Sequence, residues 1–251
     1  MENNTNQQQI NFLTFGGGSP QYHKRVKETI IEVKQFDLFD NIFGYTDLDL
    51  KKDDIFWNKH GEFIENNKRG YGYWIWKSYL ILKTLKNINY NDIIVYADVG
   101  CHYNIYNKPV LLEYINILNN SKYHGILSFE LEPYSGILKI CGGNLEKEYI
   151  KGDLFKYFNY ETNNDIKNSL QNCTTYMVVK KNYHSIKFIE KWYEICCNYY
   201  LLSDIPSIEP NEPEFIEHRH DQAIFSLLVK TYGSEKLLAQ HNVIMASRDR
   251  G

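Results

Sequence analysis

Asp98 directly follows an unbroken apolar run at residues 93–97. Such a run is typical of a strand buried on both faces of a parallel sheet. A carboxylate at its end is costly to bury unless it caps a turn, pairs with a cation or binds a metal. A divalent ion between a carboxylate and a diphosphate is a common way to neutralise a nucleotide leaving group. A plain turn residue is the alternative, because Asp is also common in turns.

Two cations, Arg69 and Lys77, enclose a stretch of glycine and aromatic residues before that strand. Lys77 falls in the first turn of an expected helix, where the helix dipole disfavours a cation but favours an anion. The pair is therefore a candidate for phosphate binding, with two solvated surface cations as the alternative. Tyr73 and Trp76 offer flat faces for a sugar or a base, with core packing as their alternative.

A glycine loop, Gly16-Gly17-Gly18, closes a short apolar run at residues 10–15. Its missing side chains would let a nucleotide lie against the backbone. No Gly-Lys-Ser/Thr follows, so the loop is not a P-loop. Taken alone, the loop is more consistent with a plain tight turn than with a nucleotide site.

A third polar cluster, EHRHDQ at residues 217–222, precedes the last expected helix. Asp221 and Gln222 at a helix start can orient a sugar hydroxyl, while His220 can contact phosphate. Asp221 could also be the N-cap of that helix, and the two roles are compatible. The histidines lack the HExxH spacing or cysteine partners of a zinc site.

The elements that must position these residues follow from periodicity. Helical spacing of apolar residues predicts helices over 26–33, 75–85, 189–199 and 224–231, the third after an N-cap at Asn182. Strands are expected at 10–15, 36–43, 93–97, 125–129 and 174–179, and a surface loop at 203–213. This alternation predicts an α/β fold, an open, mostly parallel sheet with helices on both faces. Ligands of such folds gather at the carboxyl ends of the strands, where Asp98 falls.

Composition narrows the partners. The chain has 251 residues and a net charge of −3, and this negative charge disfavours nucleic acid as a partner. No apolar run is long enough to predict a membrane span. Five cysteines without CxxC spacing indicate free thiols and a reducing compartment. Residues 1–9 are polar and unlike a signal peptide. A cytoplasmic protein is expected, one that at most touches a membrane peripherally.

Three segments in this order and spacing resemble one group of enzymes: RGYGYWIWK at 69–77, YADVGC at 96–101 and HRHDQ at 218–222. They are similar to GT-A-fold glycosyltransferases of bacterial capsule and surface-polysaccharide clusters and of some large DNA viruses. The likeness extends from residue 10 to about the C-terminus. It implies a single GT-A, Rossmann-like domain over residues 10–251 behind a flexible polar tail at 1–9, and a host-cytoplasmic location if the protein is viral.

The resemblance implies a nucleotide-sugar donor over the carboxyl edge of the sheet. Asp98 stands where such enzymes carry the first Asp of a DxD motif, which binds the ribose and the diphosphate-bound Mn²⁺ or Mg²⁺. Gly100 stands in place of the second Asp, so either another residue completes the metal shell or metal dependence is weak. By analogy with family 8 glycosyltransferases, in which a late histidine joins the metal, His241 is the candidate.

The other site residues follow from the same resemblance. Asp221 and Gln222 resemble the Asp-Gln pair that lies beside the anomeric carbon in family 8 enzymes, and they are the expected catalytic residues. Retention of configuration follows if this analogy holds, and inversion if Asp221 acts as a general base; the sequence leaves both open. The expected donor-binding residues are Thr14, Phe15, Gly16, Arg25, Arg69, Tyr73, Trp76, Lys77, Asp98, Gly100 and His220.

The expected function is metal-assisted transfer of a sugar from a nucleotide-sugar donor to a glycan or glycoconjugate. A UDP-sugar is favoured only because it is the common donor for this fold. One alternative is a non-catalytic carbohydrate- or nucleotide-binding protein, which Gly100 favours. Another is a sugar-phosphate nucleotidyltransferase, whose basic signature residues 16–25 supply poorly. Donor sugar, acceptor, linkage and oligomeric state are left open.

Overall fold

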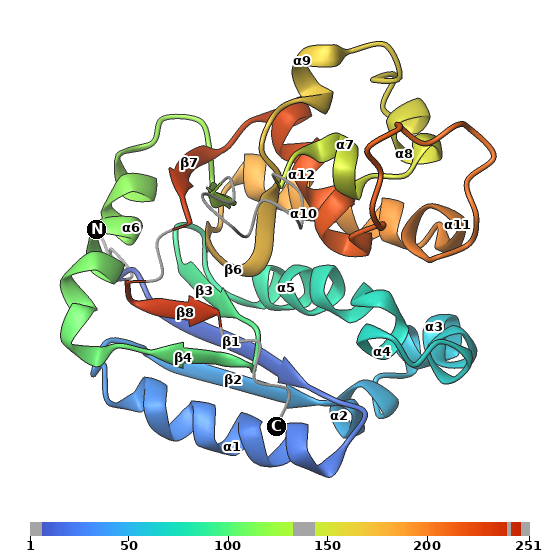
Figure 1. Cartoon of the computed structure of the whole chain (residues 1–251). Helices are drawn as coiled ribbons and strands as arrows, with labels where there is room; N and C mark the ends of the chain where they lie inside the picture. Colours follow the sequence, from blue (N-terminus) through green and yellow to red (C-terminus); the bar gives the residue numbers. More distant parts are fainter. Residues whose placement is uncertain (1–6, 133–143, 240–241, 247–251) are drawn as a thin grey trace, which may run out of the picture.

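One six-stranded sheet organises the chain. The computed structural model describes residues 7–132, 144–239 and 242–246 (Figure 1). In these residues the strand order is β2-β1-β3-β6-β5-β7, and β6 alone runs against its neighbours. The strands are β1 Ile10–Gly16, β2 Asn41–Thr46, β3 Ile93–Ala97, β5 Ile126–Glu130, β6 Asn172–Lys180 and β7 Glu235–Leu238. A two-stranded sheet pairs β4 Cys101–Tyr103 with β8 Ile244–Ala246.

Alternating side chains along the strands divide the interior into two cores, one on each face of the sheet. Tyr96 on β3 points to a core shared with helices α5, α10 and α12, whereas its neighbour Val95 points to a core shared with α1 and α6. The covering helices are α1 Pro20–Lys34, α5 Ile75–Asn87, α6 Lys108–Asn120, α10 Tyr183–Cys196 and α12 His220–Tyr232. The expected α/β architecture, a mostly parallel sheet with helices on both faces, is confirmed.

The remaining helical elements, apart from α4, complete the described chain. They are α2 Asp47–Lys51, α3 Asp54–Asn66, the 3₁₀ turn η1 Ile105–Asn107, α7 Glu146–Tyr149, α8 Gly152–Tyr157, α9 Asn164–Lys167 and α11 Tyr199–Leu202. The last four gather beyond α12, at the upper right of Figure 1. The loop over 203–213 connects α11 toward α12, as expected, and Asp153 of α8 accepts hydrogen bonds from the backbone N–H groups of Ile208 and Glu209 in it.

The segment labelled α4, Gly70–Tyr73, winds with the opposite hand to an ordinary helix. Five consecutive φ angles are positive: Gly70 56°, Tyr71 53°, Gly72 83°, Tyr73 53° and Trp74 60°. Each non-glycine residue in this region costs roughly 1–2 kcal/mol, so packing must impose the conformation. The backbone N–H of Gly72 donates to the Asn67 carbonyl at 2.9 Å, and the Trp76 indole donates to the Gly70 carbonyl at 3.0 Å. The turn ends where α5 begins, and it therefore sets the direction of the first turn of α5.

Most expected elements are confirmed, with Asn182 as the N-cap of α10. The segment over 36–43 is a partial exception, because β2 begins only at Asn41. Its apolar character has a different cause: Phe36 and Phe39 lie in a loop and pack on the core shared with α1 and α6, where the Phe39 ring lies 5.3 Å from that of Phe12. The four cysteines in the described residues are free, and Cys141 lies outside them. No helix in the described part of the chain is long and apolar enough to cross a membrane.

Candidate functional site

A buried lysine joins two of the motifs found in the sequence. The Lys77 ammonium lies 3.1 Å from Oδ1 of Asp98 and 3.5 Å from Oδ2 of Asp221. It also donates to the carbonyl oxygen and the hydroxyl of Thr174, at 3.2 and 3.3 Å. The Tyr96 hydroxyl donates to Asp98 at 2.5 Å. These five residues are called the Lys77 group below.

The fold explains why these residues meet. Asp98 is the first residue after β3, and its N–H donates to the Thr175 carbonyl of the antiparallel neighbour β6. That pairing brings Thr174 beside Asp98. The first turn of α12 adds Asp221, whose carbonyl accepts the buried Trp192 indole N–H at 2.9 Å, while the first turn of α5 adds Lys77. The group therefore lies at the carboxyl edge of β3, between two helix amino-termini.

Burial and charge together set the protonation states in the group. Burial raises the pKa of Asp221 to about 6 against the opposing charge of Lys77, and Asp98 adds to the rise. Burial lowers the pKa of Lys77, but Asp221 and Asp98 outweigh it, so the pKa is raised above its usual value. At neutral pH the group thus holds two carboxylates against one ammonium. It carries an excess of one negative charge.

Asp98 is the accessible member of this group. Its side chain is 30% exposed, compared with 5% for Asp221 and 2% for Lys77. Lys77 therefore holds the two carboxylates and does not present its own charge at the surface. The donor set fits a divalent metal brought by a diphosphate, because Mg²⁺ is commonly held by one or two carboxylates plus substrate phosphates. The described residues contain no group of three ligands that could cage a metal alone, and His241 lies outside them.

Gln222 lies beside Asp221 but is held by the protein. Its Oε1 accepts the Thr174 N–H at 3.4 Å, and its Nε2 donates to Gln171 at 2.7 Å. The interpretation of Asp221 as an N-cap is wrong, because α12 begins one residue earlier and Arg219 occupies that position. The Asp221 side chain is instead free to turn inward to Lys77 and Thr174, whose hydroxyl donates to it at 3.1 Å.

The glycine loop follows β1, next to β3 at the same sheet edge. Phe15 is buried and its ring lies 4.0 Å from the ring of Trp76, which joins two predicted donor residues in one packed pair. A Cβ on Gly16 would lie 2.8 Å from the Tyr22 carbonyl, so this glycine lets α1 approach the strand. Thr14 is fully buried, and its hydroxyl has no hydrogen-bond partner in the described residues.

Arg25 supports the turn that carries Gly100. Its guanidinium donates to the carbonyls of Val99 at 3.2 Å and Cys101 at 2.7 Å, and it pairs with Glu32. Gly100 is therefore held in a turn fixed from both sides by one side chain of α1. This arrangement makes Arg25 a support of the Asp98 turn.

Sequence reasoning missed Asp47. It directly follows β2 as Asp98 follows β3, and it contacts the His23 ring and the N–H of Gly18, the latter at 3.3 Å. Burial raises the pKa of Asp47, but the His23 and Gly18 hydrogen bonds outweigh it and lower the pKa. The sequence does carry a signal for Asp47, because it is a carboxylate directly after a strand, as Asp98 is after β3. The signal is weak because β2 is less apolar than β3.

Arg69, Tyr73 and His220 lie in a second cluster. The Arg69 guanidinium donates to Asp204 at 3.0 Å and to Glu217 at 2.9 Å, and all three side chains are more than 40% exposed. The rings of Tyr73 and His220 lie 4.6 Å apart. Arg69, Asp204 and Glu217 are called the Arg69 group below. The consecutive residues His220 and Asp221 therefore serve different clusters.

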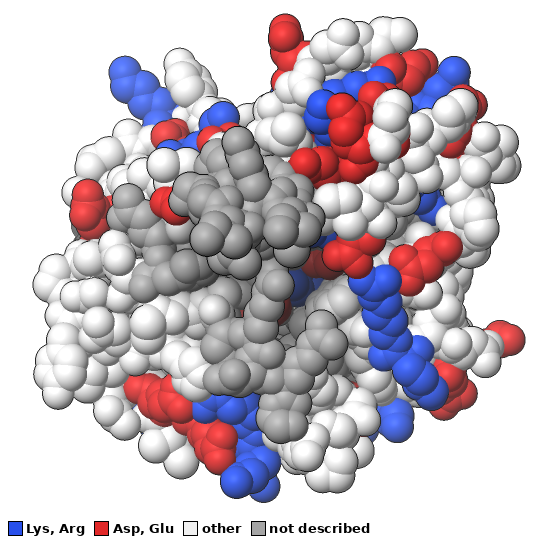
Figure 2. Space-filling view, viewed as in Figure 1, with Lys and Arg blue, Asp and Glu red and all other residues white. Residues whose placement is uncertain are grey.

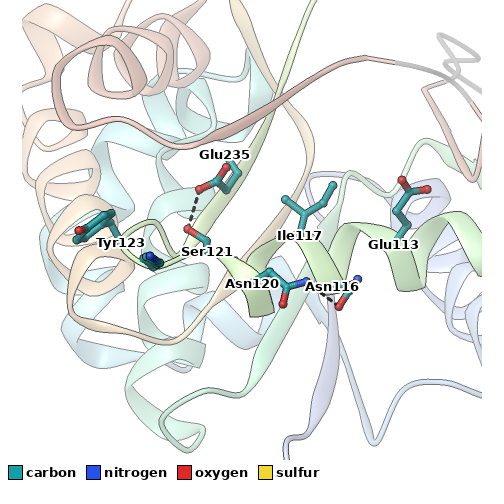
Figure 3. A pocket seen from close by; sticks show the side chains of 8 residues that line it. Glu113, Asn116, Ile117, Asn120, Ser121, Tyr123 and Glu235 are labelled. Atoms are coloured by element: carbon teal, nitrogen blue, oxygen red, sulfur yellow. Dashed lines mark hydrogen bonds between the residues drawn. The ribbon is translucent and has the colours of Figure 1, made fainter.

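A separate hollow of about 560 Å³ lies far from both groups in the fold. It is lined by Glu113, Asn116, Ile117, Asn120, Ser121, Lys122, Tyr123 and Glu235 (Figure 3). Ser121 donates to Glu235 across it at 2.7 Å. Because β5 and β7 begin here, this hollow lies at the amino edge of the sheet, where open α/β folds do not hold their ligands. The volume of this hollow alone therefore does not identify it as the functional site.

The surface charge favours no polyanion on the face that Figure 2 shows. Lys and Arg there stand beside Asp and Glu without forming a broad patch of one sign. The ion pairs between Lys147 and Glu214 and between Lys167 and Glu212 illustrate this mixing.

Comparison with solved structures finds ten similar chains, and two of them are described below. No protein-family model and no curated protein matches the sequence. The apo structure of mouse xyloside xylosyltransferase 1 is similar with 11% identity and a TM-score of 0.47, covering 92% of this chain and 72% of that one. A glycosyltransferase involved in the glycosylation of the major capsid of PBCV-1 is similar with 8% identity and a TM-score of 0.45, covering 96% and 94%. Values this low do not assign the chain to a family.

Proposed function

We propose that the chain is a glycosyltransferase that uses a nucleotide-sugar donor and a glycan acceptor. The observation that carries this proposal is the Lys77 group, in which the DxD-like Asp98 and the late Asp221 meet across one buried lysine. The group lies at the carboxyl edge of an α/β sheet, where such folds bind nucleotides. One residue from each of the three resembling segments, Lys77, Asp98 and Asp221, thus lies in this group although the segments are far apart in sequence.

The donor would lie from the glycine loop toward Asp98. The backbone of Gly16–18 and the carboxylate of Asp47 are suited to the nucleoside, since both follow strands that neighbour each other. Asp98, the most exposed carboxylate of the Lys77 group, would face the diphosphate together with its divalent cation. When bound, that cation supplies positive charge that stabilises the leaving diphosphate.

The protein's own residues act on the other charge of the reaction. Sugar transfer develops positive charge at the anomeric carbon, and the Asp221 carboxylate, which remains when Asp98 faces the cation, would stabilise it. Lys77 and Thr174 keep Asp98 and Asp221 in place, so that no reorganisation is needed as the charge develops. For scale, one well-placed hydrogen-bond donor to a developing oxyanion is worth about 3–4 kcal/mol in other enzymes.

Calorimetry with UDP-, GDP-, dTDP- and CMP-linked sugars, with and without manganese, tests the proposal. We expect one nucleotide to bind, and Asp98→Asn to weaken manganese-dependent binding at least about tenfold with the fold intact. Asp40→Asn is the matched control, because Asp40 is a carboxylate at the opposite sheet edge that accepts the Ile10 N–H. Failure of every nucleotide sugar to bind would overturn the proposal.

A second candidate is a carbohydrate- or nucleotide-binding protein without catalysis. The low exposure of Asp221 and Lys77, together with Gly100 at the second DxD position, favours it. Slow hydrolysis of the bound nucleotide sugar separates the two. Release of free sugar that is lost in Asp221→Asn supports the transferase, while tight binding without turnover supports the second candidate.

A further inference from the structure

Gln222 is the one partly exposed residue in the first turns of helix α12. Every other residue of α12 from His220 to Val229 is buried, whereas Gln222 is half-buried. Its side-chain oxygen accepts the N–H of Thr174, and the hydroxyl of that threonine belongs to the Lys77 group. Gln222 therefore lies next to the buried Asp221 and offers the more accessible polar group of the two.

The partners of the Gln222 amide fix which way it points. The backbone N–H of Thr174 can only donate, so the amide presents its oxygen there. Its Nε2 then faces Gln171 and donates to Oε1 at 2.7 Å. An amide nitrogen carries two N–H groups. Gln171 takes one of them, and the other has no hydrogen-bond partner in the described residues.

A cation fixes the orientation of Gln171 in turn. The guanidinium of Arg219, which can only donate, gives hydrogen bonds to the same Oε1 at 3.2 Å and to Oδ1 of Asn144 at 3.1 Å. Its carbon atom lies 3.3 Å from the centre of the Tyr149 ring, so the guanidinium is itself held in place. Gln171 therefore keeps its oxygen toward Arg219 and Gln222, because a half-turn of its amide would break both hydrogen bonds.

The nitrogen of the Gln171 amide contributes little by comparison. Gln171 is fully buried, and its Nε2 has no hydrogen-bond partner in the described residues. Burial raises the pKa of the neighbouring Glu146 to about 8, and Gln171 is close enough to oppose that rise, yet Oε2 of Glu146 is unpaired as well. A buried donor left unpaired costs stability. The benefit of an amide at position 171 therefore lies in its oxygen, which Arg219 and Gln222 share.

We propose, resting on the proposed transferase function, that Gln171 is a positioning residue that holds Gln222 with one amide N–H directed to an oxygen of the bound nucleotide sugar. Negative charge develops on the oxygens of the departing diphosphate during transfer. A donor that is already oriented needs no reorganisation when that charge appears. Gln171 itself does not touch the substrate, because it is fully buried and acts through Gln222.

Steady-state hydrolysis of UDP-glucose, GDP-mannose, dTDP-glucose and CMP-N-acetylneuraminic acid by the full chain tests this inference. Gln171→Met removes the shared acceptor and keeps the length of the side chain. We expect kcat to fall about tenfold and KM to change less than about twofold, because the contact of Gln222 strengthens in the transition state. Gln171→Glu keeps an oxygen for both partners, and we expect it to retain kcat within about threefold of the wild type.

A double-variant cycle shows whether Gln171 acts through Gln222. Gln222→Met alone should lower kcat at least as much as Gln171→Met, and the double variant should lower it no further. A merely structural role of Gln171 would instead multiply the two losses, and that result would contradict the positioning role.

Asn11→Leu is the matched control. Asn11 is also a fully buried amide whose oxygen accepts from a second amide, Nδ2 of Asn41 at 2.9 Å. Both residues lie at the amino ends of their strands, β1 and β2, away from Asp98. We expect this variant to lose stability and to keep kcat. An equal fall of kcat here would show that any buried amide pair has the effect, and the assignment to Gln171 would fail.

NMR of the Gln222 side-chain amide gives a readout that does not depend on turnover. In the wild type the two N–H protons should exchange with water at different rates, because only one is bonded to Gln171. Gln171→Asn keeps an amide but shortens the side chain by one CH₂, and it also replaces Gln171→Met if that variant does not fold. Both protons should then exchange rapidly. Unchanged protection in Gln171→Asn would overturn the positioning role.

The outcomes separate this inference from the proposed function. Turnover by the wild type together with unchanged kcat in Gln171→Met and Gln171→Asn removes the positioning role and leaves the transferase proposal standing. No turnover of any of the four nucleotide sugars by a chain whose Gln222 amide is held overturns the transferase, and the proposed task of the Gln222 N–H is overturned with it.

Discussion

The Lys77 group and the Arg69 group share one composition, a cation between two carboxylates, yet they differ in burial. Lys77 is 2% exposed and bridges elements from three parts of the chain. Arg69 is 45% exposed and joins two surface carboxylates. Exposed pairs contribute little because water screens them, whereas a buried charge that loses its partner is left uncompensated. Burial therefore decides which of two similar clusters the fold depends on.

Removal of the two cations should separate the groups most strongly. Lys77→Met leaves two carboxylates facing each other without a counter-ion, and we expect it to lower the free energy of unfolding by about 3–5 kcal/mol. Arg69→Met should cost less than about 1 kcal/mol for each exposed pair. Urea denaturation followed by circular dichroism measures both. Equal losses for the two variants would contradict the comparison.

Asp221 gives the comparison a pH dependence. Its pKa, raised from 3.8 to about 6, means that the folded chain keeps a proton that the unfolded chain has already released between about pH 4 and 6. Asp221 therefore lowers the free energy of unfolding as the pH rises through this window. The stability of Asp221→Asn relative to the wild type should rise from pH 4 to 6 by up to about 3 kcal/mol and then stay level. A flat difference would show that the carboxyl is not buried as described.

The Thr174 hydroxyl tests how much one hydrogen-bonding group within the Lys77 group contributes to stability. This hydroxyl accepts from Lys77 and donates to Asp221. Thr174→Val should cost about 1–3 kcal/mol, because a hydrogen bond to a charged group is lost without a change of shape. Thr231→Val is the control: its hydroxyl donates to the Leu227 carbonyl within α12 and contacts the exposed Tyr160 hydroxyl at 3.1 Å, but no charged group, so its loss should cost less. A smaller loss at position 174 than at position 231 would argue against the bridge.

Salt gives the smallest expected effect. The Debye length falls from about 10 Å at 0.1 M salt to about 3 Å at 1 M, and exposed pairs are screened first. The stability loss of Arg69→Met should shrink toward zero in 1 M NaCl, by a few tenths of a kcal/mol. The loss of Lys77→Met should stay the same. Equal salt sensitivity in the two variants would remove the distinction between the groups.

Local sequence pattern predicts part of this site, and the rest depends on contacts between segments that are far apart in the sequence. The strand at 93–97 and the position of Asp98 at its end follow from local pattern alone. Lys77 was marked by an unfavourable position at a helix start, but nothing local tells that its ammonium is buried under Asp221. Arg69 occurs in the same segment, and the sequence predicts the same phosphate-binding role for it. A left-handed turn lies between Arg69 and Lys77 and directs their side chains to different clusters. The spacing of apolar residues does not predict this turn.

Asp204 and Thr174 escaped prediction for a related reason. Asp204 lies in a loop without pattern, and Thr174 is one of several polar residues on an inner strand. Both gain their importance from partners more than 40 residues away, which only the three-dimensional arrangement supplies.

The left-handed turn over Gly70–Tyr73 has a consequence for the order of folding. Its residues have no intrinsic preference for that hand, so the turn cannot nucleate and must wait for the surfaces that hold it. Elements that form after the transition state affect the unfolding rate and leave the folding rate nearly unchanged. The turn should therefore form late in folding, and changes in it should alter the unfolding rate more than the folding rate. Because the turn leads directly into Lys77, the candidate site would be among the last parts of the molecule to assemble.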